Sequence, residues 1–309
     1  MKQKRSSLMI AVALAVITLL TSSSTARTRA VTPKAPSTGE QLMALMGAVN
    51  AQLAGRNANI RVNSAAYLTR DDSKEPGQTV FFNDRAKQLD EQFVPFDPRR
   101  GGGADITYRV DQTEGAVDGL TVAQTTAAID RAMTTWNNVN CSTLPITKLP
   151  DLPGVDIGAI ESLLIGQPAE LIRFADIIHA GWLPGGILPP DVIGVTFSII
   201  FVDEQEQPTD IDNNGKIDIA FREILYNDAF IWTVGPINSD IDVETVALHE
   251  SGHGLSQGHF GKAFLTNPNG KIHFAPLAVM NATYSGIRLE IKQTDNGGHC
   301  SIWGSWPNK

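Results

Sequence analysis

The stretch HESGHGLSQGHF, residues 249–260, carries three of the six histidines in this chain of 309 residues. His249 and His253 are four residues apart, so on a helix their side chains lie on one face, one turn apart. Glycines then loosen the chain, and a helix that ends near Gly254 lets it double back and bring His259 to the same point. The stretch therefore predicts a helix followed by a turn, arranged so that three imidazoles meet.

Three neutral imidazole nitrogens with a fourth position left open are typical of a catalytic zinc ion rather than a structural one. We therefore expect one zinc ion bound by His249, His253 and His259. Glu250 follows the first ligand by one residue, which places its carboxylate beside the metal as a general base for metal-bound water. The alternative is a polar helix with solvated histidines, which predicts nothing about the downstream sequence.

Apolar spacing along the chain predicts helices and strands that fit a layered α+β protein. The predicted helix that carries His249 and His253 starts at Ser239, and Ser239 and Asp242 have the spacing of a capping box. The predicted helices cover residues 40–53, 121–138 and 239–255, and the predicted strands cover residues 59–69, 79–83, 104–110 and 192–203.

A methionine-containing segment, AVMNATYSG at residues 278–286, lies downstream of the histidines. HExxHxxxxxH followed by such a turn resembles the metzincin zinc endopeptidases, and most of all the matrixins, the family of the matrix metalloproteinases and their bacterial relatives. DNGGHCSIWG, residues 295–304, is similar to the last helix of that family. The resemblance runs from about residue 104 to the end. It implies an α+β metzincin fold, with a twisted, mostly parallel five-stranded sheet, an active-site helix, an N-terminal helix and a C-terminal helix.

The resemblance also implies roles for individual residues. Met280 becomes the hydrophobic floor under the zinc ion, with ordinary core packing as the alternative. Tyr284 becomes part of the wall of the S1′ pocket. The strand VTFSIIF, residues 195–201, becomes a sheet edge on which an extended substrate lies antiparallel, whereas its apolar run also fits a strand of the core.

The implied function is that of a secreted zinc-dependent endopeptidase acting on a protein or peptide substrate in its active-site cleft. A zinc hydrolase of a non-peptide amide would use the same residues. A third hypothesis is a secreted, metal-stabilised binding module without catalysis. Glu250 argues against that module, because a purely structural zinc site needs no base.

Two features depart from the matrixin pattern. Ser256 stands where the family has glycine, and a left-handed serine there costs ~1–3 kcal/mol unless Gly254 and Gly258 take over the bend. The chain has no cysteine before Cys141, so the cysteine switch that keeps matrixins latent cannot operate. If residues 27–100 are a propeptide, they block the zinc by other means or only assist folding.

The first 26 residues resemble a signal peptide, with a positive start, an apolar run over residues 8–20 and a small-residue exit ending at Ala26. The apolar run is shorter than the ~20 residues of a membrane span. We therefore expect a protein secreted to the extracellular space or periplasm, without a membrane anchor after cleavage. Removing the three positive charges of residues 1–26 changes the formal net charge from −8 to −11, which argues against nucleic acid as a partner.

The remaining chain divides at FVPFDPRRGGG, residues 93–103, whose prolines, glycines and paired arginines predict an exposed joint. Residues 27–100 are then a linker and an N-terminal segment, and residues 101–309 a matrixin-like catalytic domain. Cleavage after Arg99-Arg100 would make the N-terminal segment a removable prodomain. The rival hypothesis is that its helix and strands pack permanently on the rest.

A second metal site is predicted in DIDNNGKID, residues 210–218, whose spacing resembles the first nine positions of an EF-hand calcium loop. Phe221 stands where a bidentate glutamate is expected, so a full EF-hand is excluded. Glu223 or Asp203 would have to complete the cage. The alternative is an Asx-rich turn without a metal ion. The predicted calcium ligands are Asp210, Asp212, Asn214 and Asp218.

Cys141 and Cys300 are the only cysteines. In an oxidising compartment they most simply form one disulfide, and two buried free thiols are the alternative. His179, His273 and His299 are isolated in the sequence, and a lone histidine is more often a hydrogen-bonded structural residue than a metal ligand.

Overall fold

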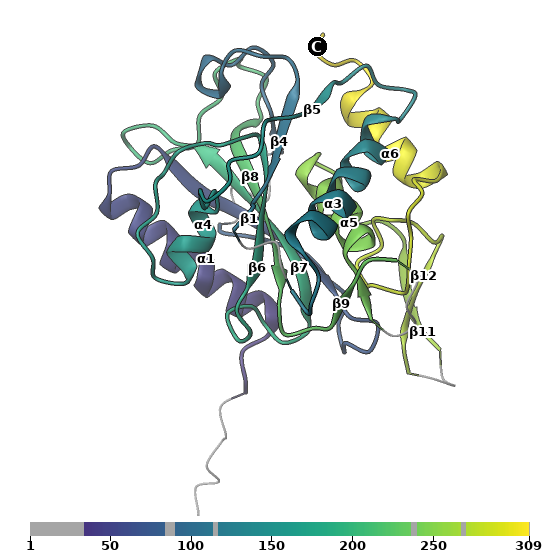
Figure 1. The fold of residues 1–309 in the computed structure, drawn as a ribbon. Coiled ribbons are helices and arrows are strands. Elements are labelled where there is room, and N and C mark those ends of the chain that lie inside the picture. The colour runs from purple at the N-terminus through teal and green to yellow at the C-terminus, as the bar shows by residue number, and fades with distance from the viewer. Residues whose placement is uncertain (1–33, 84–89, 114–116, 236–239, 267–269, 309) are drawn as a thin grey trace, which may run out of the picture. The chain divides into compact units, whose positions relative to one another are not determined.

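The computed structural model describes residues 34–83, 90–113, 117–235, 240–266 and 270–308. Residues 36–309 form one compact unit (Figure 1). The predicted signal peptide and the helix start at Ser239 lie outside the described residues. Within the described ranges, no helix combines the length and the apolar character that a membrane span requires.

The core of this unit is a mixed sheet of eight strands. In spatial order the path is β2-β1-β7-β8-β6-β4-β5, and β3 pairs with β8 beside it. Neighbours are parallel from β8 through β6 and β4 to β5, and antiparallel from β8 through β7 and β1 to β2. The strands are β1 (Ile60–Thr69), β2 (Thr79–Phe81), β3 (Glu91–Gln92), β4 (Ile106–Val110), β5 (Ile146–Lys148), β6 (Ile177–Leu183), β7 (Val192–Phe201) and β8 (Ile217–Asn227).

The prediction of a mixed, mostly parallel sheet is confirmed, but the number of five strands is wrong. The segment before residue 100 contributes β1, β2 and β3 to the same sheet. The prediction that residues 195–201 form a sheet edge is also wrong. β7 lies between β8 and β1, because β1 pairs with it from Ile60 opposite Phe201 to Thr69 opposite Val192.

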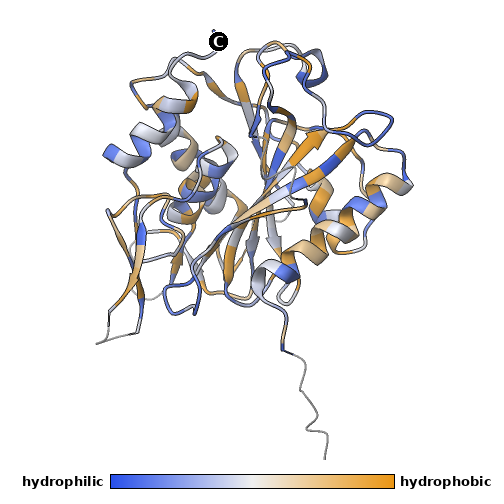
Figure 2. Ribbon diagram, turned by 180° about the vertical axis from the view of Figure 1, so that it is seen from behind, coloured by the Kyte–Doolittle hydropathy of each residue, from blue (hydrophilic) through white to orange (hydrophobic). Residues whose placement is uncertain are grey.

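Helices cover both faces of the sheet (Figure 1). α1 (Thr38–Gly55) and α4 (Ala159–Leu164) pack on one face, and α3 (Val122–Asn137), α5 (Val243–Gly254) and α6 (Gln293–Trp303) lie on the other side. Every residue of β7 and β8 is buried, as expected for strands covered on both faces. Figure 2 shows the hydrophobic residues gathered in these central strands.

Local sequence signals explain where these helices begin. α1 and α3 start with capping boxes, Ser37 with Glu40 and Thr121 with Gln124. α5 begins at Val243, later than predicted, with Asp242 as its N-cap. The delay arises because β10 (Ile241–Asp242) first pairs with β9 (Trp232–Thr233). The remaining strands, β11 (Lys262–Leu265) and β12 (Ile272–Ala275), form a hairpin after the histidine turn.

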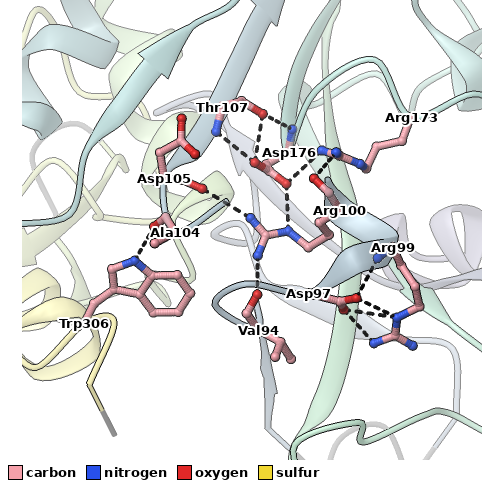
Figure 3. A network of polar contacts seen from close by, with 10 residues as sticks. All are labelled: Val94, Asp97, Arg99, Arg100, Ala104, Asp105, Thr107, Arg173, Asp176 and Trp306. Atoms are coloured by element: carbon pink, nitrogen blue, oxygen red, sulfur yellow. Dashed lines mark hydrogen bonds and ion pairs between the residues drawn. The ribbon is translucent and has the colours of Figure 1, made fainter. Parts of the chain in front are cut away.

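The segment of residues 93–103 is exposed in part, at Phe96, Pro98, Gly101 and Gly102, but polar contacts tie its arginines to the rest of the unit (Figure 3). Arg100 is buried, and its guanidinium donates to Asp176 (2.8 Å) and to the carbonyl of Val94 (2.7 Å). Arg99 donates to Asp97 and packs over the ring of Phe201. Arg99 also pairs with Asp218 (2.7 Å), so each arginine has a carboxylate partner distant in sequence, which the composition of the segment does not indicate.

Candidate metal centre

The three predicted zinc ligands converge. His249 and His253 lie one turn apart on α5, and their Nε2 atoms are 3.1 Å apart. The turn after α5 brings His259 back, so that its Nε2 lies 3.1 Å from that of His253. The predicted helix end at Gly254 is confirmed, and these three imidazoles form a group that could hold a metal ion.

Hydrogen bonds fix how two of the rings are protonated. Nδ1 of His249 lies 2.7 Å from the carbonyl oxygen of Val279, and Nδ1 of His253 lies 2.8 Å from that of Gln257. A carbonyl oxygen only accepts, so each Nδ1 carries the proton and each Nε2 keeps its lone pair. Burial lowers the pKa of His249 to about 4 and the pKa values of His253 and His259 well below 6.5. Neutral imidazoles with converging lone pairs fit a divalent cation.

Glu250 is fully buried beside this cluster. Its Oε2 accepts a hydrogen bond from Thr196 Oγ1 on β7 (2.6 Å), whereas its Oε1 has no hydrogen-bond partner among the residues that the structure describes. Burial raises the pKa of Glu250 to about 8. Gly194 on β7 leaves room for the carboxylate, since a Cβ there would lie 3.0 Å from Oε1. In the ionised form of Glu250 this oxygen is free to accept a proton, as a general base requires.

Ser256 keeps the left-handed conformation, with a φ of 65°. The strain is therefore carried by the serine rather than moved to the neighbouring glycines. Its hydroxyl accepts a hydrogen bond from Arg222 Nη1 (2.9 Å), a contact that glycine could not make.

Arg222 is a residue of this site that the sequence analysis missed. It lies buried on β8 and donates to the carbonyls of His253 (2.5 Å) and Gly254 (3.1 Å), the last residues of α5. Its Nη2 pairs with Glu91 on β3 (3.0 Å). A cation at a helix C-terminus satisfies free carbonyls and complements the helix dipole. The only sequence signal was an arginine within a strand that is mostly apolar.

Met280 lies buried beneath α5. A Cβ on Gly252 would lie 2.3 Å from Met280 Sδ and 2.9 Å from Trp136, so only glycine permits this approach. Asp295 on α6, also missed from the sequence, accepts hydrogen bonds from the backbone amides of Val279 (2.9 Å) and Met280 (3.0 Å). The C-terminal helix thereby positions the turn that orients His249 through Val279.

Tyr284 lines a pocket that also contains His249, as the predicted wall of a substrate pocket would. Its hydroxyl accepts a hydrogen bond from the amide of Asp242, the N-cap of α5 (3.1 Å). Burial raises its pKa. The tyrosine therefore links this pocket to the start of the helix that carries the histidines.

The predicted calcium loop brings three carboxylates together, with oxygens of Asp210, Asp212 and Asp218 within 4.8 Å of one another. Asn214 lies in the same loop, where its Oδ1 accepts from the amide of Lys216. Asp218 Oδ2 also accepts from Arg99 (2.7 Å). A guanidinium thus already neutralises one carboxylate of the cluster.

The proposed completion of the calcium cage by Glu223 is wrong. Its carboxylate is fully buried and accepts hydrogen bonds from the amides of Ile160 (3.0 Å) and Glu161 (2.7 Å) at the start of α4. Asp203 accepts from the amides of Gln205 and Gln207 instead. Because the donor set is short of oxygens, calcium in this loop stays a prediction.

The predicted disulfide between Cys141 and Cys300 is present, and it joins the segment after α3 to α6. His179 and His299 are buried structural residues, as expected. His179 Nδ1 lies 2.8 Å from the hydroxyl of Tyr226, and His299 stacks on Trp136. Neither belongs to the three-histidine cluster, although His179 Nε2 lies 3.5 Å from the hydroxyl of Ser251 on α5.

Fold and site together define an α+β protein with a largely buried cluster of three histidines that could hold a metal ion. No protein-family model matches the chain, and comparison with curated proteins finds no similar sequence.

Proposed function

We propose that this protein is a secreted zinc endopeptidase of the metzincin type. The observation that carries the proposal is the pairing of three neutral, converging imidazoles with a buried glutamate whose Oε1 has no partner. Nitrogen ligands in this number, with a position left open, suit zinc in a catalytic role. His249, His253 and His259 would hold the ion.

A bound zinc ion supplies an activated water molecule and polarises the substrate carbonyl. Glu250 would accept the proton of that water as it attacks the peptide carbon, and would then give the proton to the leaving amine. Thr196 orients the carboxylate through Oε2, which leaves Oε1 for proton transfer. Burial excludes competing bulk water from this carboxylate.

Two alternatives use the same residues. A hydrolase of non-peptide amides would share the whole site and differ only in the pocket beside it. A binding module without catalysis would need the histidines but would have no reason to bury an unpaired carboxylate, which costs free energy. The partnerless Oε1 of Glu250 therefore favours an enzyme.

The test compares the wild type with Glu250→Gln and His253→Ala in zinc content and in hydrolysis of an unfolded protein substrate. We expect about one zinc per chain in the wild type and in Glu250→Gln, and a loss of zinc in His253→Ala. Hydrolysis should fall by at least about 100-fold in Glu250→Gln, because proton transfer contributes about that much. Measurable hydrolysis that is equal in the wild type and in Glu250→Gln would contradict the proposal.

His179→Gln is a matched control, because this buried histidine contacts none of the three proposed ligands. It should keep its zinc. A wild type without zinc after full loading would exclude the metal site, whereas a zinc-loaded wild type that cleaves amides but no peptides would favour the second hypothesis.

A further inference from the structure

β1 and β2 form a hairpin, residues 60–81, in which β1 pairs with β7 along its whole length. Residues of β1 also line the pockets that contain His249 and His253. An extended peptide that binds a sheet edge pairs with it in this antiparallel way. We propose that this hairpin is a built-in occupant of the substrate position and keeps the intact chain latent. The inference rests on the proposed function, since only a peptide-cleaving site has an extended substrate to exclude.

Thr69, at the end of β1, is bonded on the side away from β7 as well. Its amide donates to the carbonyl of Ala282 (3.4 Å), and its carbonyl accepts from the amide of Tyr284 (2.8 Å). Thr69 and Thr283 form a parallel bridge. β1 therefore lies between β7 and the segment that follows Met280, with main-chain hydrogen bonds to both.

Leu68 fills the pocket lined by His249 and Tyr284. Its side chain is 2% exposed, and a cavity of only about 10 Å³ remains beside it. Such a space holds one water molecule at most. No second apolar side chain can enter this pocket while Leu68 is present.

Gly77, in the loop between β1 and β2, lies against the main chain of β1. A Cβ on Gly77 would be 1.9 Å from the carbonyl oxygen of Tyr67, and the amide of Gly77 donates to Ala282 (2.8 Å). The amide of Tyr67 donates to the carbonyl of Gln78 (3.1 Å). The peptide bond between Tyr67 and Leu68 is thus packed against the loop of its own hairpin, as expected of a built-in occupant and not of a substrate.

The hairpin also borders the cluster on its other side. A cavity of about 370 Å³ is lined by Ser64 and Ala66 of β1 together with the ligand His253. Ser198 of β7, the register partner of Ser64, lines the same cavity. One continuous strand therefore passes both His249 and His253, the position that an extended peptide would need.

These contacts give the chain a route to latency that needs no cysteine. Pairing with β7 and the filling of the Leu68 pocket both have to be undone before another peptide can bind. β1 is buried along almost its whole length, so the opening has to be local, at the end of the strand that carries Leu68 and Thr69. Loosening the hairpin should therefore raise peptide binding, and with zinc present it should raise hydrolysis.

Gly77→Ala tests the inference in the full chain, with Gly55→Ala as control because its added methyl meets no atom within 4 Å. The probe is a fluorescent peptide of the β1 sequence NSAAYLTR, residues 63–70, added to zinc-free protein so that binding alone is measured. We expect binding at least about tenfold tighter in Gly77→Ala than in the wild type or Gly55→Ala. Amide exchange at Leu68 and Thr69 should be at least about tenfold faster in that variant.

A second variant covers the case in which Gly77→Ala does not fold. Leu68→Ala empties the pocket while adding no steric conflict, and we expect it to bind the peptide in the same way. A disulfide between Ser64→Cys and Ser198→Cys, introduced into either variant, locks β1 onto β7 and should abolish the gained binding. The two single-cysteine variants control for the loss of each serine.

The outcomes separate this inference from the proposed function. Peptide binding by the wild type and the locked variant as tight as by Gly77→Ala overturns the occupant. Gains in binding and exchange without hydrolysis after zinc loading leave the occupant standing and count against the peptidase. Hydrolysis as fast in the wild type and in the locked variant as in Gly77→Ala leaves the peptidase standing and overturns latency.

Discussion

At the scale of single residues, the site depends on two glycines that leave room for the groups packed against them. Gly252 lacks a side chain where Met280 and Trp136 approach α5, and Gly194 lacks one where Glu250 is buried. Neither glycine has the positive φ that would itself require glycine. Close packing around α5 therefore explains why both positions are glycine, and an added methyl group at either position should disturb that packing.

We expect Gly252→Ala to lower the free energy of unfolding, although alanine is the better helix former by about 1 kcal/mol. The added methyl overlaps Met280, and overpacking of this kind costs about 1–3 kcal/mol. Gly258→Ala is the control, since its methyl meets no atom within 4 Å and should change stability by about 0.5 kcal/mol or less. Denaturant unfolding of zinc-free protein measures both, and equal effects would contradict the packing argument.

The buried histidines should make the zinc-free protein sensitive to acid. The folded-state pKa of His249 is about 4, below the usual 6.5, so between these values the unfolded state binds a proton that the folded state does not. The contribution of His249 is present above pH 6.5 and is lost as the pH falls towards 4. His253 and His259 shift in the same direction.

Glu250 acts in the opposite sense, because its raised pKa makes the folded state bind the extra proton between pH 4.5 and about 8. The measurement therefore belongs in the Glu250→Gln variant. We expect its free energy of unfolding to fall steadily as the pH is lowered from 6.5 to 4, and to fall less when His249 is also replaced by glutamine. A flat profile in Glu250→Gln would refute the assignment of neutral buried imidazoles.

At the scale of elements, a strand holds the end of the helix that carries the ligands. Arg222 projects from β8 to the last carbonyls of α5, and Glu91 on β3 neutralises it. Burial lowers the pKa of Arg222, while Glu91 opposes that shift. Three elements are thus joined at the point where the chain turns from His253 to His259.

Arg222→Leu should destabilise the protein by about 3–5 kcal/mol, because it removes one partner of a buried ion pair and the donors of the α5 carbonyls. Zinc affinity should fall as well, since the turn to His259 loses its support. Arg131→Leu is the control, because its pair with Glu244 is half exposed and worth about 1 kcal/mol or less. Unfolding and zinc titration measure the two effects, and similar losses in both variants would argue against the role of Arg222.

At the scale of the whole molecule, the segment before residue 100 is part of the central sheet. α1 and β1 share one hydrophobic core with α4 and β7, and the arginines at residues 99 and 100 are paired with buried carboxylates. The disulfide between Cys141 and Cys300 ties the other side of the unit together. Removal of the N-terminal segment would therefore expose apolar surface and break ion pairs.

Trypsin should leave the bond after Arg100 intact in the folded protein. Its side chain is buried and bonded to Asp176, and a protease needs an exposed, extended segment. We expect cutting there only under conditions that unfold the sheet. Mass spectrometry of the digest decides the point, and a native fragment that begins at Gly101 and keeps its fold would restore the hypothesis of a removable prodomain.

The sequence by itself predicted which three histidines converge and which glutamate lies beside them. His249, Glu250 and His253 share one helix, so helical periodicity is enough to align them, and the glycines after them signal the return of His259. The helices at residues 38–55 and 122–137 carry their own capping boxes and apolar stripes. Such features depend on neighbours within a few residues, which is why they could be predicted.

Only the tertiary structure decided which surfaces were covered. The pairing of β1 with β7 joins residues more than a hundred positions apart, and no local pattern distinguishes an apolar edge strand from an apolar central one. The same holds for Arg99 and Arg100, whose partners Asp218 and Asp176 come from other segments. Long-range partners decide whether a strand or a charge is buried, and here they covered β7, for which the apolar sequence fitted an edge strand and a core strand equally well.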